Sequence, residues 1–129
     1  MRTPPPDLRR HVLVVDDEPH IGRIVQLRLA SGPYEVETVY DGEAALDRLR
    51  SPDPIDVILL DIVLPRVSGL EVLATLRELP HRAGTPVIML TAKGQEADRM
   101  RAEELGATDF LTKPFSPKKL LARINELFQ

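Results

Sequence analysis

Short apolar runs alternate with longer amphipathic segments along the whole chain. Most of these runs are continuous rather than alternating, which is typical of strands that are buried on both faces of a sheet. One run alternates apolar with polar residues, which predicts a more exposed strand at 34–39. We expect five strands, at residues 11–15, 34–39, 55–60, 86–90 and 108–111.

The segments between these runs place apolar residues at helical spacing. Asp41 and Ser116 are suited to cap a helix N-terminus, and Pro117 is suited to the first helical position. We expect five helices, over residues 19–30, 42–50, 68–79, 95–105 and 117–127. The fourth helix is polar, and its thin apolar stripe is predicted to be Ala97, Met100 and Leu105.

Strands that alternate with helices form a parallel sheet that is covered by helices on both faces. The crossovers between such strands are right-handed. A length of 129 residues with a single composition regime fits one domain. The sequence therefore predicts a doubly wound α/β domain over residues 11–129, preceded by a Pro-rich, disordered or extended lead-in at residues 1–10.

The composition argues against several classes of function. A formal net charge of -3 and a pI of about 5.6 disfavour a nucleic-acid-binding surface, which is usually strongly basic. The absence of cysteine excludes disulfides and thiolate metal sites and is compatible with the cytoplasm. The apolar runs are far shorter than the roughly 20 residues that cross a bilayer, and the N-terminus lacks the apolar core of a secretory signal. We expect a cytoplasmic domain without direct nucleic-acid contact or membrane insertion.

Chemically distinctive side chains gather where the predicted strands end. Asp16 and Asp17 follow the first strand, Asp61 the third and Thr91 the fourth, and Lys113 lies just past the fifth. In open parallel sheets, ligands bind beyond the carboxyl ends of the strands at the topological switch point. Three carboxylates that meet there repel one another unless a cation neutralises them. Oxygen ligands without histidine or cysteine favour Mg²⁺ (or Mn²⁺) over zinc.

This set of side chains suits phosphoryl chemistry. An aspartate beside a bound metal can act as a nucleophile that forms an aspartyl phosphate, and Asp61 has that position. Lys113 can pair with Asp61 at rest and with a phosphoryl oxygen afterwards, and the Thr91 hydroxyl can donate to another phosphoryl oxygen. Taken singly, these residues would be helix caps, turn residues or surface charges. Together at one sheet edge, they predict a site.

Four stretches carry these residues: VLVVDDE, DVILLDIVLPRVSGLEVL, VIMLTA and DFLTKPF. In order and spacing they resemble the receiver domain of two-component response regulators of the chemotaxis-regulator-like type, over about residues 11–128. The resemblance implies a flavodoxin-like fold with strand order 2-1-3-4-5. It also implies a phosphoacceptor switch rather than an enzyme with substrate turnover.

The resemblance implies a role for each acid. Asp61 would be the phosphoacceptor, phosphorylated by a sensor histidine kinase, a phosphotransfer protein or a small phosphodonor. Asp17, Asp61 and the backbone carbonyl of Val63 would hold the metal ion, and Asp16 would act through metal-bound water.

The same resemblance covers the residues around the acids. Lys113 would contact the phosphoryl group, and its peptide bond to Pro114 would be cis. Pro65 and Gly69 match the turn after the acceptor, where a glycine would also suit a backbone with positive φ.

Switching and lifetime are assigned to further positions. Thr91 would move toward the phosphoryl group, and Phe110 would rotate into the vacated space. Val63 and Lys93 would tune the lifetime of the aspartyl phosphate. Because the Val63 side chain cannot hydrogen-bond an attacking water, we expect slow hydrolysis.

The resemblance also implies that phosphorylation would change the exposed face of the last two helices and the fifth strand. This face would bind a partner protein or a second copy of the chain. Basic residues expected near that face are Arg99, Arg101, Lys118 and Lys119. Ordinary solvated surface charge is the alternative explanation for them.

Two other functions stay open. A receiver-like module could bind partners independently of phosphorylation, although every expected pocket residue is present. A metal-dependent aspartyl phosphatase uses similar acids but commonly carries a second aspartate two residues after the nucleophile, where this chain has Val63. The sequence also leaves open whether the domain stands alone or belongs to a longer regulator.

Overall fold

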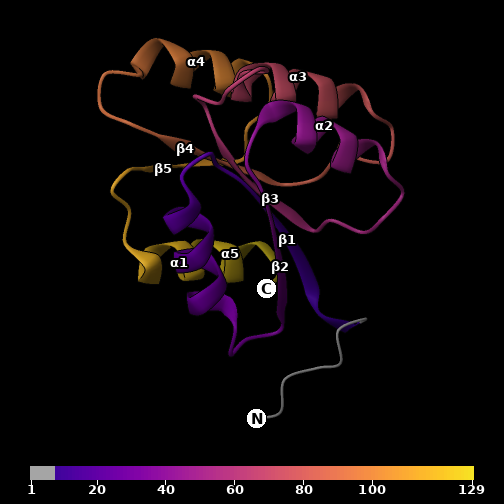
Figure 1. Ribbon diagram of the computed structural model, residues 1–129, viewed down its shortest axis with the longest axis vertical. Helices are drawn as coiled ribbons and strands as arrows, with labels where there is room; N and C mark the ends of the chain where they lie inside the picture. Colours follow the sequence, from indigo (N-terminus) through magenta and orange to yellow (C-terminus); the bar gives the residue numbers. More distant parts are fainter. Residues whose placement is uncertain (1–7) are drawn as a thin grey trace.

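Strands and helices alternate strictly along residues 8–129, which are the part of the chain that this computed structural model describes (Figure 1). The strands are β1 (Arg10–Val15), β2 (Tyr34–Val39), β3 (Val57–Asp61), β4 (Val87–Thr91) and β5 (Asp109–Thr112). The helices are α1 (Pro19–Leu29), α2 (Gly42–Arg50), α3 (Gly69–Glu78), α4 (Glu96–Glu104) and α5 (Pro117–Leu127). None of the helices in the described residues is long and apolar enough to span a bilayer.

The strands form one parallel sheet in the order β2-β1-β3-β4-β5, which confirms the expected topology. α1 and α5 pack side by side on one face, and α2, α3 and α4 follow one another across the other face (Figure 1). The strand order reverses between β1 and β3, so the topological switch point lies there. The carboxyl ends of all five strands meet at one edge.

Three strands start one or two residues later than predicted and end one residue later. They extend because their last residues still belong to the ladder: Asp61 lies opposite Leu90, and Thr91 lies opposite Thr112. The acid and the threonine hydroxyl are therefore held by the sheet itself rather than by the loops that follow.

The predicted lead-in is shorter than expected at its C-terminal end. Arg10 is already the first residue of β1, because its N–H donates to the carbonyl oxygen of Pro33 at 2.8 Å. Arg9 forms an ion pair with Glu35 on β2 at 3.3 Å. The rest of the predicted lead-in, residues 1–7, lies outside the described residues.

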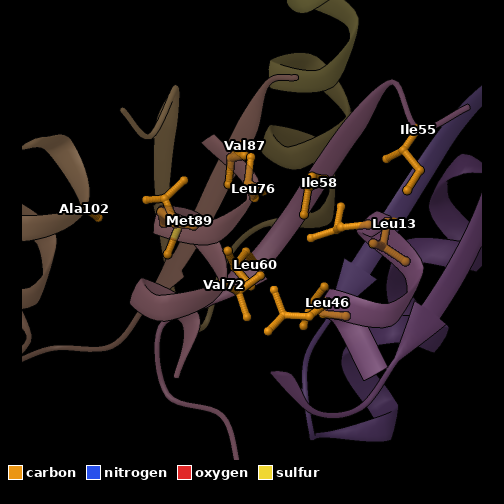
Figure 2. Close-up of a cluster of buried hydrophobic side chains, with 14 of the residues drawn as sticks. Leu13, Leu46, Ile55, Ile58, Leu60, Val72, Leu76, Val87, Met89 and Ala102 are labelled. Atoms are coloured by element: carbon orange, nitrogen blue, oxygen red, sulfur yellow. The ribbon is translucent and has the colours of Figure 1, made fainter. Parts of the chain in front are cut away.

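Each face of the sheet carries its own apolar cluster, because successive strand residues point to opposite faces. In β3, Ile58 and Leu60 join the cluster that packs against α2, α3 and α4 (Figure 2). Val57 and Leu59 join the cluster on the α1 and α5 side. All four side chains are fully buried, each stabilising the fold by about 1.5–3 kcal/mol. Burial on both faces explains the continuous apolar runs in the sequence.

The apolar stripe predicted for α4 is wrong at Ala97 and Met100 and confirmed at Leu105, which packs against the core. Ala97 and Met100 are exposed, Met100 to 64%, and Leu105 is half-buried. The buried residue of α4 is Ala102, and the half-buried Asp98 lies one turn before it. The face of α4 that points to the core therefore includes the polar residue Asp98, and for this reason the pattern of hydrophobic residues did not identify that face. α4 is consequently anchored to the core mainly by one small side chain.

The predicted helix caps are confirmed. The Asp41 side chain accepts the Ala44 N–H at 2.7 Å, and the Ser116 hydroxyl accepts the Lys119 N–H at 3.3 Å. Such caps satisfy backbone donors that the first helical turn leaves free, and each stabilises a helix by about 1 kcal/mol.

Gly69 is required by a close approach and not by its backbone angle, so the expectation of a positive φ there is wrong. Among the described residues, positive φ occurs at Arg66, Gly94 and Gly106. A Cβ atom at position 69 would lie 2.0 Å from the carbonyl oxygen of Asp61. The first residue of α3 therefore packs directly on the end of β3.

Gly69→Ala is expected to lower the free energy of unfolding by about 2–4 kcal/mol, because the added methyl group must displace the backbone beside Asp61. Urea denaturation followed by circular dichroism measures the change. Gly84→Ala is the matched control, since a Cβ there meets nothing within 4 Å, and it should change the free energy by less than about 0.5 kcal/mol. Equal effects in the two variants would contradict the close approach.

Candidate functional site

Acidic side chains from two neighbouring strands converge at the carboxyl edge of the sheet. β1 and β3 are paired as far as Val15 and Leu60. The residues that follow, Asp16 and Asp61, therefore lie side by side at the edge of the sheet. Asp17 and Glu18 follow in the loop that leads to α1. Carboxylate oxygens of all four residues lie within 4.8 Å of one another. Like charges this close repel one another strongly unless cations lie between them.

An ammonium group lies among these carboxylates. The Nζ atom of Lys113 lies 2.7 Å from Asp61 Oδ2, 2.7 Å from Asp16 Oδ2 and 2.9 Å from Glu18 Oε1. Lys113 follows directly on β5, and its peptide bond to Pro114 is cis, as the resemblance implied. Four carboxyl groups thus lie beside a single ammonium group in this part of the described structure, so acidic groups outnumber the basic one.

The surroundings shift the pKa values of the cluster in opposite directions. Burial raises the pKa of Asp61, although the Lys113 ammonium and the Val63 N–H oppose this, and the charge on Asp16 adds to it. Burial lowers the pKa of Lys113, but its ion pairs outweigh burial, so the net shift is upward. The hydrogen bond from Lys113 lowers the pKa of Glu18. Lys113 therefore stays charged. For Asp61, the Lys113 ion pair and the Val63 hydrogen bond offset only part of the cost of burying the ionised carboxylate.

Asp61 lines an open cleft of about 360 Å³ together with Asp17, Val63 and Lys113. Its Oδ1 atom accepts the Val63 N–H at 3.0 Å, and its Oδ2 atom faces Lys113. The Asp61 side chain is 10% exposed, so a small group entering the cleft can reach it. Asp16 is fully buried and does not line the cleft.

The acidic cluster fits a hard divalent cation. Asp16 Oδ2 is buried, and it shares the Lys113 ammonium group, 2.7 Å away, with Glu18 and Asp61. A buried carboxylate that shares its cation in this way, close to three further carboxylates, belongs to the oxygen-only set that Mg²⁺ prefers. Asp16, Asp17, Glu18 and Asp61 could contribute ligand atoms.

The predicted switch and tuning residues lie in different places around the site, and Val63 lines the acidic cleft itself. Thr91 and Lys93 line a second cleft, of about 180 Å³, between the end of β4, α4 and β5. The Phe110 ring is half-buried against the core on the α4 side. The guanidinium group of Arg99 lies over this ring, 4.6 Å from its centroid, in a cation–π contact.

The sequence analysis gave no role to three polar residues at the site. Glu18 belongs to the acidic cluster, and it lies at the end of the first strand directly after two aspartates. Gln95 accepts the Ala92 N–H at 2.7 Å, and both residues line both clefts. The Thr112 hydroxyl lies 3.5 Å from that of Thr91. The periodicity of apolar residues does not identify Gln95 or Thr112, because both are polar and come from different parts of the chain.

Residues 12–125 match the family described as response regulator receiver domain. The chain belongs to this family. It is therefore a receiver domain of the kind found in response regulators of two-component systems. The match also agrees with the five-stranded order and the acidic edge described above.

The receiver domain is similar to several named proteins. It is 41% identical over 122 residues to the alkaline phosphatase synthesis transcriptional regulatory protein PhoP of Bacillus subtilis, which covers 95% of this chain and 50% of PhoP. The chain thus spans about half the length of that curated relative.

Solved structures give the same fold. The chemotaxis response regulator CheY4 of Vibrio cholerae superposes with a TM-score of 0.85 at 34% identity, covering 92% of this chain and 98% of CheY4. The BeF3-activated receiver domain of DrrB, a Thermotoga maritima OmpR/PhoB homologue, gives a TM-score of 0.82 at 33% identity, covering 93% of this chain and 97% of that domain.

Asp61→Asn is expected to raise the free energy of unfolding near neutral pH without divalent ions, because burial makes the ionised carboxylate costly in the folded state. The folded-state pKa lies above the unfolded value of about 3.9, so this cost is absent below the unfolded pKa and develops as the pH rises through the folded-state pKa. The difference in the free energy of unfolding between Asp61→Asn and the wild type should therefore become smaller as the pH is lowered toward about 4.

Urea denaturation in the presence of EDTA at both pH values measures this difference. Asp47→Asn, at an exposed position on α2, is the control and should have little effect at either pH. An Asp61→Asn variant that is less stable than the wild type near neutral pH would show that the Lys113 ion pair outweighs the burial cost.

Proposed function

We propose that this receiver domain is a phosphorylation-controlled switch with Asp61 as its phosphoacceptor. The observation that carries the proposal is the position of Asp61 Oδ2, which lies 2.7 Å from Lys113 Nζ and borders the open acidic cleft. A carboxylate that is accessible to a phosphodonor and adjacent to a fixed ammonium group is suited to attack phosphorus. The same ammonium group can then pair with the transferred phosphoryl group.

In the proposed reaction, an ionised carboxylate oxygen of Asp61 forms a bond to phosphorus while the bond from phosphorus to the donor nitrogen of a phosphohistidine breaks. The imidazole keeps the bonding electron pair. Lys113 Nζ, already beside Asp61, then pairs with a phosphoryl oxygen. The Thr91 hydroxyl, at the end of the adjacent strand, donates to a second phosphoryl oxygen.

A bound Mg²⁺ or Mn²⁺ ion would supply the positive charge that the acids and the phosphoryl group together require. Asp17, Asp61 and the backbone carbonyl of Val63 would hold it, and Asp16 would act through bound water. The support for this assignment is the short spacing of the four carboxylates and the single ammonium group that three of them share.

The added phosphoryl group brings about -1.5 to -2 of charge into the pocket. In our proposal Thr91 moves toward it, and Phe110 fills the vacated space. α4 would respond readily, because Ala102 is its single fully buried residue among those described. The α4-β5-α5 face would then bind a partner protein or a second copy of the chain, without direct contact to nucleic acid. The exposed basic residues available on or beside this face are Arg99, Arg101, Lys118 and Lys119.

The named relatives support a switch function. One solved relative is the BeF3-activated DrrB receiver domain, and PhoP is a transcriptional regulatory protein. For this chain we propose a sensor histidine kinase or a phosphotransfer protein as the upstream partner, a cytoplasmic location, and no turnover of substrate as an enzyme.

Incubation with acetyl phosphate and Mg²⁺ should add a single phosphoryl group, because Asp61 combines access to the cleft and the Lys113 contact with a carboxylate that the Val63 N–H holds in place. Intact mass spectrometry detects the adduct. Asp61→Asn should abolish it, and Asp47→Asn, an exposed acid on α2, should not. A wild type that forms no adduct, or forms it at another residue, would contradict the proposal, and steady hydrolysis of phosphate esters would favour the aspartyl phosphatase alternative.

Val63→Asn should shorten the lifetime of the aspartyl phosphate about fivefold, the factor that corresponds to one added hydrogen bond of about 1 kcal/mol to an attacking water. Val63 is exposed and lines the cleft that contains Asp61, so its side chain is positioned to influence that water. Decay of labelled phosphate measures the rate. Leu27→Asn, at an exposed apolar position on α1, is the control, and an unchanged rate in Val63→Asn would contradict this role.

A further inference from the structure

Gln95 connects the acidic cleft with the start of α4. It occupies the N-cap position of this helix, yet its side chain makes no capping hydrogen bond to it. Instead its Oε1 atom reaches back and accepts the Ala92 N–H at 2.7 Å. Gln95 and Ala92 both line the cleft that contains Asp61 and Lys113, and both also line the second cleft.

The Ala92 N–H lies where a phosphoryl group on Asp61 would need donors. Asp61 pairs with Leu90 in the β3–β4 ladder, and Ala92 follows at the same edge of the sheet. The Ala92 side chain is a single methyl group, so it screens little of its own backbone from the cleft. A charged phosphoryl oxygen is a stronger acceptor than a neutral amide oxygen, because charge-assisted hydrogen bonds are roughly twice as strong.

We propose that Gln95 is a latch that competes with the phosphoryl group for the Ala92 N–H. At rest the Gln95 amide oxygen holds this donor, and a phosphoryl group on Asp61 takes the donor over and releases Gln95. This inference rests on the proposed function of Asp61. Gln95 is a positioning residue in it, because it controls a donor of the site without reacting itself.

Release of Gln95 would reach α4 directly, since Gln95 is the residue from which this helix begins. α4 has fewer buried residues than the other described helices, since Ala102 is its buried residue and Ala97 and Met100 are exposed. Occupancy of the acidic cleft would therefore be coupled to the start of α4 by one exchanged hydrogen bond. This coupling needs no contact between the phosphoryl group and the helix itself.

A purely structural role of the same hydrogen bond makes the opposite prediction. If Gln95 only stabilises the turn at residues 92–95, its removal disorders the cleft and weakens the binding of a phosphoryl mimic. If Gln95 competes for the donor, its removal strengthens that binding. The sign of the effect separates the two roles.

The test is a titration of the protein with beryllofluoride in the presence of Mg²⁺, measured by calorimetry. Gln95→Ala and Gln95→Met both remove the acceptor, and each should bind about three- to tenfold more tightly than the wild type, as expected for the loss of one competing hydrogen bond. Gln95→Glu introduces a charged acceptor and should bind about tenfold more weakly. Gln26→Ala, at an exposed glutamine on α1, is the matched control and should bind like the wild type.

The amide resonance of Ala92 gives a second readout. In the absence of beryllofluoride, its exchange with solvent should be faster in Gln95→Ala than in the wild type, with the thermal unfolding of both proteins recorded alongside. Unchanged or weaker binding by both Gln95→Ala and Gln95→Met would overturn the latch while leaving Asp61 as the acceptor. A wild type that binds no beryllofluoride would overturn the proposed function, and the latch with it.

Discussion

The functional edge of this receiver domain depends on one ammonium group held among four carboxylates. Lys113 contacts Asp16, Glu18 and Asp61 at 2.7–2.9 Å, yet it cannot neutralise them together with Asp17. A buried charge that is not fully paired is costly, so the resting site holds a deficit of positive charge. In the proposed switch, this deficit would favour a bound cation, and Lys113 would pair first with Asp61 and then with the phosphoryl group.

A rigid sheet edge and a loosely attached helix meet at this site. Asp61 is fixed by the β3–β4 ladder, by the Val63 N–H and by the close approach of Gly69 to its carbonyl oxygen. α4, by contrast, has Ala102 as its buried anchor. In the proposed switch, phosphoryl transfer would need the fixed position of Asp61, because a reacting group must stay in place. Signalling would need the weak anchoring of α4, because a small change in free energy must then be enough to move this helix.

In the proposed switch, Asp61 and α4 would be coupled through side-chain packing and through hydrogen bonds that change partners. Phe110 carries no hydroxyl, and the Arg99 guanidinium covers its ring at 4.6 Å from the centroid. Gln95 and Ala92 border both the acidic cleft and the cleft of Thr91. In the proposed switch, a change of charge at Asp61 would act on Gln95 and Ala92, which line the same cleft and adjoin the start of α4.

Much of this receiver domain was predictable from its sequence. The apolar runs and helical spacing predicted every strand and helix in the described residues, and the acids at the strand ends indicated the site, because periodicity and strand ends are local properties of the chain. The tertiary structure alone decided which side chains complete it. Glu18 and Gln95 were given no role, and two residues of the α4 stripe and the reason for Gly69 were misjudged. These features depend on how the elements pack at the sheet edge, as when Lys113 reaches Glu18 from 95 residues away, and the periodicity of the chain does not give that packing.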